Sequence, residues 1–153
     1  MTNTTNKKRG FEIVSTYQDQ NIDLPTRATE HSAGYDVSAA ETVTIAPGEI
    51  KLVATGLKVY MQPNEVLYLF DRSSNPRKKG LVLSNSVGVI DSDYYNNPDN
   101  EGQIFGQFTN ITSQSVTINK GERIMQGVFM PFLVADNDNA TGDRKGGFGS
   151  TGK

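Results

Sequence analysis

The sequence predicts an all-β protein, a jelly-roll-like sandwich or barrel with one short helix at about residues 73–79. Apolar or alternating runs of strand length recur along the chain, and Gly, Pro or Asn stands in nearly every gap between them. Many short strands at close spacing are typical of sandwiches, jelly rolls and barrels. The expected strands are residues 11–17, 42–46, 50–61, 65–71, 81–85, 87–91, 104–111, 115–119 and 124–134.

Residues 73–79 carry the signals of a short helix. Ser73 or Ser74 suits its cap, Pro76 is tolerated in its first turn, and Gly80 suits its exit. The same start places an arginine, Arg72, beside serine hydroxyls and free backbone amides, which together can bind an anion such as phosphate. A capping serine beside a solvated arginine is the equally good alternative.

The two ends of the chain are expected to lie outside the β domain. Residues 1–10 are polar, so we expect a disordered tail before a domain that spans residues 11–134. The last 19 residues, 135–153, contain five glycines and one aromatic residue. This composition cannot build a core and predicts a flexible glycine-rich tail.

Composition excludes several classes of function. The chain has 153 residues, a formal charge of −2 and a pI near 5.4, so no basic stripe for nucleic acid is expected. Cysteine is absent, which excludes disulfides and thiolate metal sites. The first residues, MTNTTNKKRG, lack the apolar segment of a secretory signal, and no apolar run approaches the ~20 residues of a membrane helix. A cytoplasmic protein without membrane contact is expected.

The central stretch LVLSNSVGVIDSDY, residues 81–94, predicts strand, turn and strand, with acids at the far end. Asp91, fixed at the end of the far strand beside whatever the hairpin tip binds, is a plausible general base. The alternative from this stretch alone is a hairpin capped by solvated acids.

Other residues narrow the chemistry. His31 is the single histidine and lies in a polar loop, so carboxylates are the expected acid–base groups and metal ligands, a donor set that suits magnesium. The tail end, residues 147–153, matches a P-loop by spacing but has no strand before it and no helix after it. Its glycines and hydroxyls still suit phosphate. Phe148 has no core to join, so it either lies frayed and exposed or stacks on a flat partner such as a nucleobase.

Five segments occur together in one order: AGYDVSA at 33–39, RSSNPRKKG at 72–80, SNSVGVIDSDY at 84–94, GERIMQ at 121–126 and GGFGSTG at 146–152. This set closely resembles the five motifs of the trimeric dUTPase family, from about residue 11 to the end of the chain. The resemblance implies a β jelly roll with one short helix and a homotrimer with active sites shared between subunits. It also implies hydrolysis of dUTP to dUMP and pyrophosphate with Mg²⁺.

The resemblance also assigns roles to matching positions. Asp91 matches the aspartate that activates the water attacking the α-phosphorus, and Asp36 matches the acid that reaches the metal through water. Arg123 matches a structural position. The positions that match contacts to uracil and the sugar are Asn85, Gly88 and Ile90 for uracil, Phe148 stacking on uracil as the tail closes, and Tyr94 for the deoxyribose. The positions that match phosphate contacts are Arg72, Ser73, Ser74 and Gln126, with Arg144, Ser150 and Thr151 for the terminal phosphates.

The chain departs from the family pattern at two places. An inserted segment, YNNPDNEG at 95–102, leaves either Tyr94 or Tyr95 as the ring that faces the sugar, and it resembles a subset from Gram-positive bacteria and their phages. In the tail, Arg144 stands two residues before Gly146, so either Arg144 or Lys145 serves the γ-phosphate.

Three other functions compete with this reading. A dCTP deaminase of the same fold needs a glutamate beside the hairpin, and residues 81–95 contain none. A nucleotide-gated module that binds a regulatory protein partner would use the inserted segment and the tail, but would leave Asp91 unexplained. A structural jelly-roll subunit would need none of the five motifs.

Overall fold

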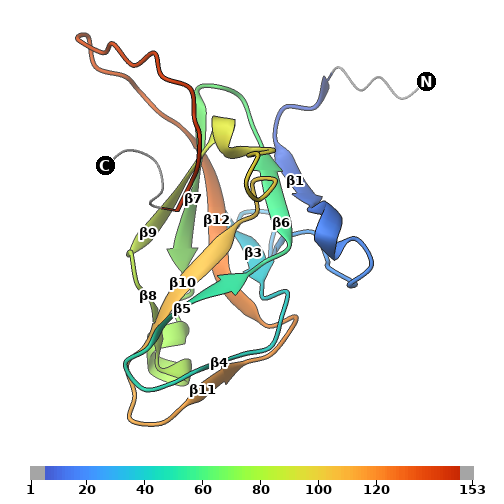
Figure 1. Cartoon of the computed structure of the whole chain (residues 1–153), viewed down its shortest axis with the longest axis vertical. Coiled ribbons are helices and arrows are strands. Elements are labelled where there is room, and N and C mark those ends of the chain that lie inside the picture. The colour runs from blue at the N-terminus through green and yellow to red at the C-terminus, as the bar shows by residue number, and fades with distance from the viewer. Residues whose placement is uncertain (1–5, 149–153) are drawn as a thin grey trace.

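The computed structural model describes residues 6–148, and within them the chain is built almost wholly of β-strands (Figure 1). The largest sheet has five strands in the order β2 (Thr26–Arg27), β3 (Tyr35–Ser38), β12 (Arg123–Pro131), β7 (Glu65–Asp71) and β9 (Val87–Asp91). All of its pairings are antiparallel. The expected all-β jelly roll is confirmed.

Three smaller sheets complete the domain. One has three strands in the order β5 (Ile50–Ala54), β10 (Phe105–Asn110) and β8 (Leu81–Leu83). Two are ribbons, formed by β1 (Gly10–Ile13) with β6 (Leu57–Tyr60) and by β4 (Val43–Ile45) with β11 (Val116–Ile118). Strands β8 and β9 follow one another but belong to different sheets, so the hairpin tip between them joins the two layers.

The core lies between the sheets, where alternate residues of each strand point inward. Its largest fully buried side chains include Phe108, Leu67, Leu69, Ile104 and Met125. A β-bulge between Arg123 and Met125 shifts the register of β12. The two consecutive residues Ile124 and Met125 are therefore both buried.

Short helices connect the strands: η2 (Ser15–Tyr17), η3 (Asn75–Lys79) and η4 (Ser92–Tyr94). Helix η3 is the expected one, with Pro76 in its first turn and Gly80 at its exit in the left-handed conformation (φ 67°). Ser74 stands at the N-cap position, as expected, but its side chain makes no cap hydrogen bond. The Asp71 carboxylate instead accepts from the backbone N–H of Arg72 (2.9 Å) and the side-chain amide of Asn75 (2.6 Å).

Several strands differ from their expected limits. The run 50–61 is split into β5 and β6 at Gly56 (φ 71°), beside the buried Thr55, whose hydroxyl donates to the carbonyl of Ile104 at 2.7 Å. Strand β1 begins at Gly10, and Arg9 forms an ion pair with Glu65 at 2.6 Å, so the chain touches the domain before residue 11. The exact domain limits stay a prediction.

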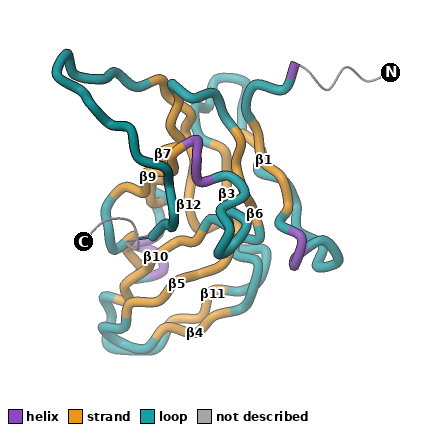
Figure 2. Tube along the Cα trace, turned by 45° about the horizontal axis from the view of Figure 1, so that its top comes forward, coloured by secondary structure: helices purple, strands orange, loops and turns teal. Residues whose placement is uncertain are grey.

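After β12 the chain runs out from the domain as a long loop and returns to lie beside β9 (Figures 1 and 2). No regular element forms in residues 132–148. The loop starts with three exposed apolar residues, Phe132, Leu133 and Val134. Among residues 6–148, no helix is long and apolar enough to cross a bilayer.

Candidate active site

Strand β9 lies at the edge of the five-stranded sheet and, within the described residues, pairs only with β7. A tight turn leads into it: Ser86 is left-handed (φ 67°), and its N–H donates to the carbonyl of Leu83 at 3.1 Å. An edge strand leaves backbone donors and acceptors unpaired. Gly88 and Ile90 are two residues apart, so their backbone groups point to the same edge.

A cavity of about 250 Å³ lies at this edge, enclosed by β9, its neighbours and the returning tail. Small-molecule pockets usually have volumes of about 300–1,000 Å³. The cavity can therefore enclose the base and sugar of a nucleotide, while a triphosphate must extend beyond it. Its lining residues are Leu69, Leu83, Asn85, Gly88, Val89, Ile90, Asp91, Tyr94, Phe105, Gln107, Met125, Arg144, Gly147 and Phe148.

Asp91 is the carboxylate at the cavity wall, at the end of β9, with half of its side chain exposed (50%). Arg144 from the tail donates to Asp91 through Nη2 and to Asp93 through Nε, the latter at 2.6 Å. The hairpin therefore places Asp91, the predicted general base, beside the cavity. The guanidinium of Arg144 lies against the Asp91 carboxylate.

Tyr94 lines the cavity, whereas Tyr95 points away from it. Tyr94 is 3% exposed, and its hydroxyl donates to the carbonyl of Gln103 at 2.5 Å. Burial raises the pKa of Tyr94, partly offset by a hydrogen bond from Asn100. Tyr95 donates to Glu12 on β1, and this bond together with burial raises the pKa of Tyr95 to about 12. Of the two candidate rings, the structure brings only Tyr94 to the cavity.

The tail closes the cavity on one side. The Phe148 ring meets Tyr94 at 5.7 Å and Phe105 at 5.5 Å, both edge-on. Arg144 lines the cavity, whereas Lys145 is exposed. Of the two candidates for the γ-phosphate, Arg144 is thus the one beside the cavity. Ser150 and Thr151 lie outside the described residues.

The remaining predicted residues form a second group, away from the cavity, at the junction of β3, β12 and β7. Asp36 is the register partner of Gln126 and forms an ion pair with Arg123 at 3.5 Å. Arg72 donates to the carbonyl of Arg123 at 3.4 Å, and the Gln126 amide donates to the carbonyl of Asp71 at 3.3 Å. Ser73 and Ser74 stand at the start of η3, next to Arg72. We call these residues the anion group: Asp36, Arg72, Ser73, Ser74, Arg123 and Gln126.

The anion group is separated from Asp91 by an apolar surface. Gln126 is paired with Phe70 on β7, and Asp91 is paired with Val66, four residues away on the same strand. At a rise of ~3.3 Å per residue this offset is roughly 13 Å along the strand, and Gln126 and Asp91 also lie on strands to either side of β7. The face between them carries Tyr68, Phe70, Val87, Val89, Val128 and Met130.

The described residues contain no cluster of three or more His, Cys, Asp or Glu that could hold a metal ion. His31 is exposed in its loop, as expected. Magnesium commonly keeps its water ligands and is bound through one or two carboxylates plus substrate phosphates, so this arrangement fits a metal carried on a nucleotide.

Sequence reasoning missed several residues of the cavity wall. Phe105 and Gln107 come from β10, and Leu69 and Met125 come from the five-stranded sheet. Their alternating patterns show that each strand has a buried face. The patterns carry no signal for which cavity that face meets, because the pairing of distant strands decides it.

Comparisons with known proteins bear on the family of the chain. The dUTPase family model matches residues 20–152. The deoxyuridine 5'-triphosphate nucleotidohydrolase of Lactococcus lactis is 68% identical over 148 residues, covering 95% of this chain and 99% of that protein. The corresponding protein of Enterobacter sp. is 39% identical over 155 residues, covering 96% of this chain and 98% of that protein.

Solved structures show the same fold. The crystal structure of dUTPase from Streptococcus mutans has a TM-score of 0.81 and 64% identity, covering 84% of this chain and 99% of that chain. The dUTPase from phage phi11 of S. aureus has a TM-score of 0.73 at 22% identity, covering 88% of this chain and 96% of that chain, and supports the fold alone.

The fold and the cavity at its sheet edge define a jelly-roll enzyme of nucleotide metabolism. The chain belongs to the dUTPase family, as its five motifs predict. The Lactococcus and Streptococcus relatives fit the Gram-positive subset that the inserted segment indicated. The comparisons do not favour a deaminase, a purely regulatory module or a structural subunit.

Proposed function

We propose that the chain hydrolyses dUTP to dUMP and pyrophosphate, with Asp91 activating the water that attacks the α-phosphorus. The observation that carries this proposal is the carboxylate of Asp91 at the wall of a base-sized cavity on an edge strand. Uracil would meet the backbone of Gly88 and Ile90 and the side chain of Asn85, and Phe148 would stack on it as the tail closes.

These positions support the following reaction. With the base and sugar held in the cavity, the triphosphate extends past Asp91, whose carboxylate orients a water molecule and takes its proton. Water attacks the α-phosphorus and pyrophosphate leaves, so positioning and charge neutralisation supply most of the rate. Arg144 would leave Asp91 and Asp93 and bind the γ-phosphate instead. The Asp91 carboxylate would then be available as the general base. Ser150 and Thr151 would bind the terminal phosphates beside it.

The separation of the two groups supports active sites that are shared between copies of the chain. The phosphates beside Asp91 cannot reach Arg72, Ser73, Ser74 and Gln126 of the same copy across an apolar surface. That surface includes side chains that are 57% (Val89) and 46% (Met130) exposed, as expected of a face that a second copy covers. We propose a homotrimer in which the anion group of one copy meets the cavity of the next.

Magnesium would be carried on the triphosphate, with Asp36 holding it through a water ligand. When bound, it neutralises phosphate charge and so favours departure of pyrophosphate. A structural Mg(II) ion is described for a mutant dUTPase of phage phi11.

The test is pyrophosphate release from purified protein with magnesium, offering dUTP, dCTP, dTTP and UTP separately. Release from dUTP alone is the expected result. Deamination of dCTP, or binding of dUTP without release, would contradict the proposal. The mass of the particle in solution, measured by light scattering, tests the trimer.

Asp91→Asn tests the role of the carboxylate. The amide keeps the shape but cannot take a proton, so binding of dUTP should persist while turnover falls by about 10²–10⁴-fold. Asp93→Asn is the matched control, because Asp93 also contacts Arg144 but does not line the cavity. Near wild-type turnover of Asp91→Asn would show that Asp91 is not the base.

A further inference from the structure

The inserted segment 95–102 closes around Tyr94. The N–H of Asn97 donates to the carbonyl of Tyr94 at 3.1 Å, and the N–H of Gln103 donates to the carbonyl of Asn100 at 3.1 Å. The side-chain amide of Asn100 donates to the Tyr94 hydroxyl at 2.8 Å, and that hydroxyl donates to the carbonyl of Gln103 at 2.5 Å. The phenol is therefore fixed from two sides, by the segment and by the residue that follows it.

The Asn100 side chain is itself held in place. Its Oδ1 accepts from the N–H of Gly102 at 2.9 Å, which leaves the amide NH₂ for Tyr94. Gly102 is left-handed (φ 83°), and a Cβ there would come within 2.5 Å of the Tyr94 carbonyl oxygen. A glycine is thus required where the segment passes the Tyr94 backbone.

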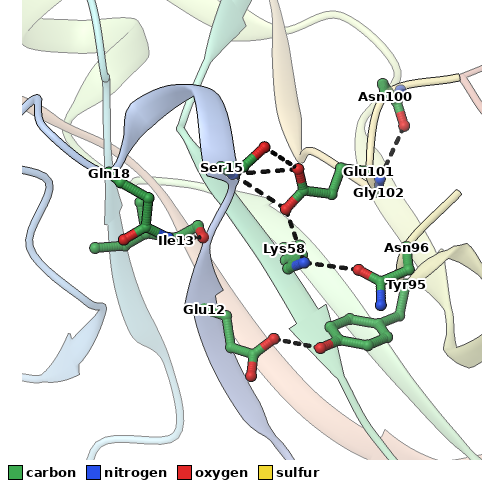
Figure 3. A network of polar contacts seen from close by, with 10 residues as sticks. All are labelled: Glu12, Ile13, Ser15, Gln18, Lys58, Tyr95, Asn96, Asn100, Glu101 and Gly102. Carbon is green, nitrogen blue, oxygen red and sulfur yellow. Dashed lines mark hydrogen bonds and ion pairs between the residues drawn. The ribbon is translucent and has the colours of Figure 1, made fainter. Parts of the chain in front are cut away.

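Through Glu101 the segment is anchored to strand β6 of the β1–β6 ribbon and to helix η2, which follows β1 (Figure 3). The Glu101 carboxylate accepts from the Ser15 hydroxyl at 2.5 Å, the Ser15 N–H at 3.1 Å and the Lys58 ammonium at 2.8 Å. Lys58 also donates to Asn96 at 2.6 Å. The Tyr95 ring packs edge-on to Tyr60 at 6.2 Å, with its hydroxyl bonded to Glu12.

These contacts form one chain of support from the ribbon, through Glu101 and Asn100, to the wall of the cavity. A ring that excludes a single extra hydroxyl must be held to within roughly 0.5 Å, because a small displacement makes room for that oxygen. Tyr94 is a wall residue whose hydroxyl points away from the cavity into this support, so its position depends on the segment.

We propose that segment 95–102 is a positioning element for Tyr94 and that Asn100, anchored through Glu101, sets how strictly the cavity rejects a ribose in place of a deoxyribose. The proposal rests on the proposed function and on the role that the family resemblance assigns to Tyr94, as the residue that faces the deoxyribose. Asn100 acts through Tyr94 and does not itself line the cavity.

The test compares Asn100→Ala, Tyr94→Phe and the double variant with the wild type. Asp99→Ala is the control, because Asp99 lies in the same segment and its exposed carboxylate forms no ion pair with the described residues. Three quantities are measured for each: kcat/KM for dUTP, UTP and dCTP, binding of dUMP and UMP, and the melting temperature.

The preference for dUTP over UTP should fall about three- to tenfold in Asn100→Ala, the factor that one hydrogen bond contributes. It should fall at least as far in Tyr94→Phe, which removes the bonds of the hydroxyl to both Asn100 and Gln103. The preference for dUTP over dCTP should stay unchanged, because base selection uses β9. Asn100→Ala should add nothing to the loss of sugar preference in the Tyr94→Phe background, since its contact with the Tyr94 hydroxyl is already gone and its other contact, with Gly102, does not reach the ring. The Asp99→Ala variant should match the wild type.

Unchanged sugar preference in folded Asn100→Ala and Tyr94→Phe would overturn the proposal. A parallel loss of sugar and base preference would overturn it too, because it would indicate general damage. If Asn100→Ala does not fold, the sugar preference of Tyr94→Phe decides alone. A wild type that binds dUMP better than UMP without hydrolysing dUTP would overturn only the proposed function, and the variants are then judged by binding. A wild type without sugar preference would overturn both.

Discussion

One added methyl group at Gly147 tests whether the tail must close on Tyr94 for turnover. A Cβ at this position would lie 2.6 Å from Tyr94 Cε1 and 3.0 Å from Cδ1. Tyr94 cannot give way, because it is 3% exposed and its hydroxyl is bonded to Gln103 and Asn100. The tail must move instead, and Phe148, the next residue, moves with it.

The size of the effect follows from the contacts that Phe148 loses. Its ring meets Tyr94 and Phe105 edge-on, and each such pair contributes about 0.5–1.5 kcal/mol beyond the buried area. Loss of both weakens the closed tail by about 1–3 kcal/mol. If turnover requires closure, kcat/KM for dUTP falls about 5- to 150-fold, at roughly 1.4 kcal/mol for each factor of ten.

The assay is steady-state pyrophosphate release, with the melting temperature as a check on folding. The melting temperature should not change, since the tail contributes no residue to the main core cluster. Gly142→Ala is the matched control, because a Cβ at Gly142 has no atom within 4 Å. The reasoning fails if Gly147→Ala keeps kcat/KM within about twofold of the wild type, or if Gly142→Ala loses as much.

Three further predictions concern stability and the tail. Asn110→Ala should destabilise the fold by about 3 kcal/mol in denaturant unfolding. The buried Asn110 amide donates to the carbonyls of Ile45 and Gln114, and its oxygen accepts two hydrogen bonds from Thr112. As a control, the exposed Asn119→Ala should cost less than about 0.5 kcal/mol. Hydrogen bonds from Lys58 and Ser15 lower the pKa of Glu101 from 4.5 to about 2. The contribution of the ionised Glu101 carboxylate to folding stability is therefore complete above pH 4.5 and is lost as the pH falls toward 2. The gap in melting temperature between wild type and Glu101→Gln should therefore close over that range, and a constant gap would contradict the assignment. Deleting residues 144–153 should sharply lower turnover but leave the proposed trimer intact, as light scattering can show, and a monomeric product would refute this division between tail and domain.

Much of the fold can be predicted from local pattern. Alternation of apolar and polar residues indicates strands such as β7 and β10, and Pro76 and Gly80 mark the limits of η3. Strand β3 escapes this approach, because its four residues include Asp36 and Ser38 on the face that is not buried. Its place in the sheet depends on pairing with β12, which lies more than 80 residues further along the chain.

The candidate site shows the same limit. The motifs predict Asp91, Tyr94 and Phe148, and the structure brings these three to one cavity. The sequence leaves Tyr94 and Tyr95 equivalent, because adjacent residues differ only in which way each ring turns. The packing of the segment 95–102 against the β1–β6 ribbon decides between them, and that is a tertiary property.

The apolar surface between Asp91 and the anion group has a consequence for genetics. Under the proposed assembly, each active site takes its general base, Asp91, from one polypeptide and its phosphate-binding residues from another. A polypeptide damaged at Asp91 and one damaged at Gln126 would each be inactive alone. Refolded together, the two would form mixed assemblies in which some centres receive both intact halves, so the mixture would regain a fraction of wild-type activity. Two lesions at Asp91 would show no such complementation.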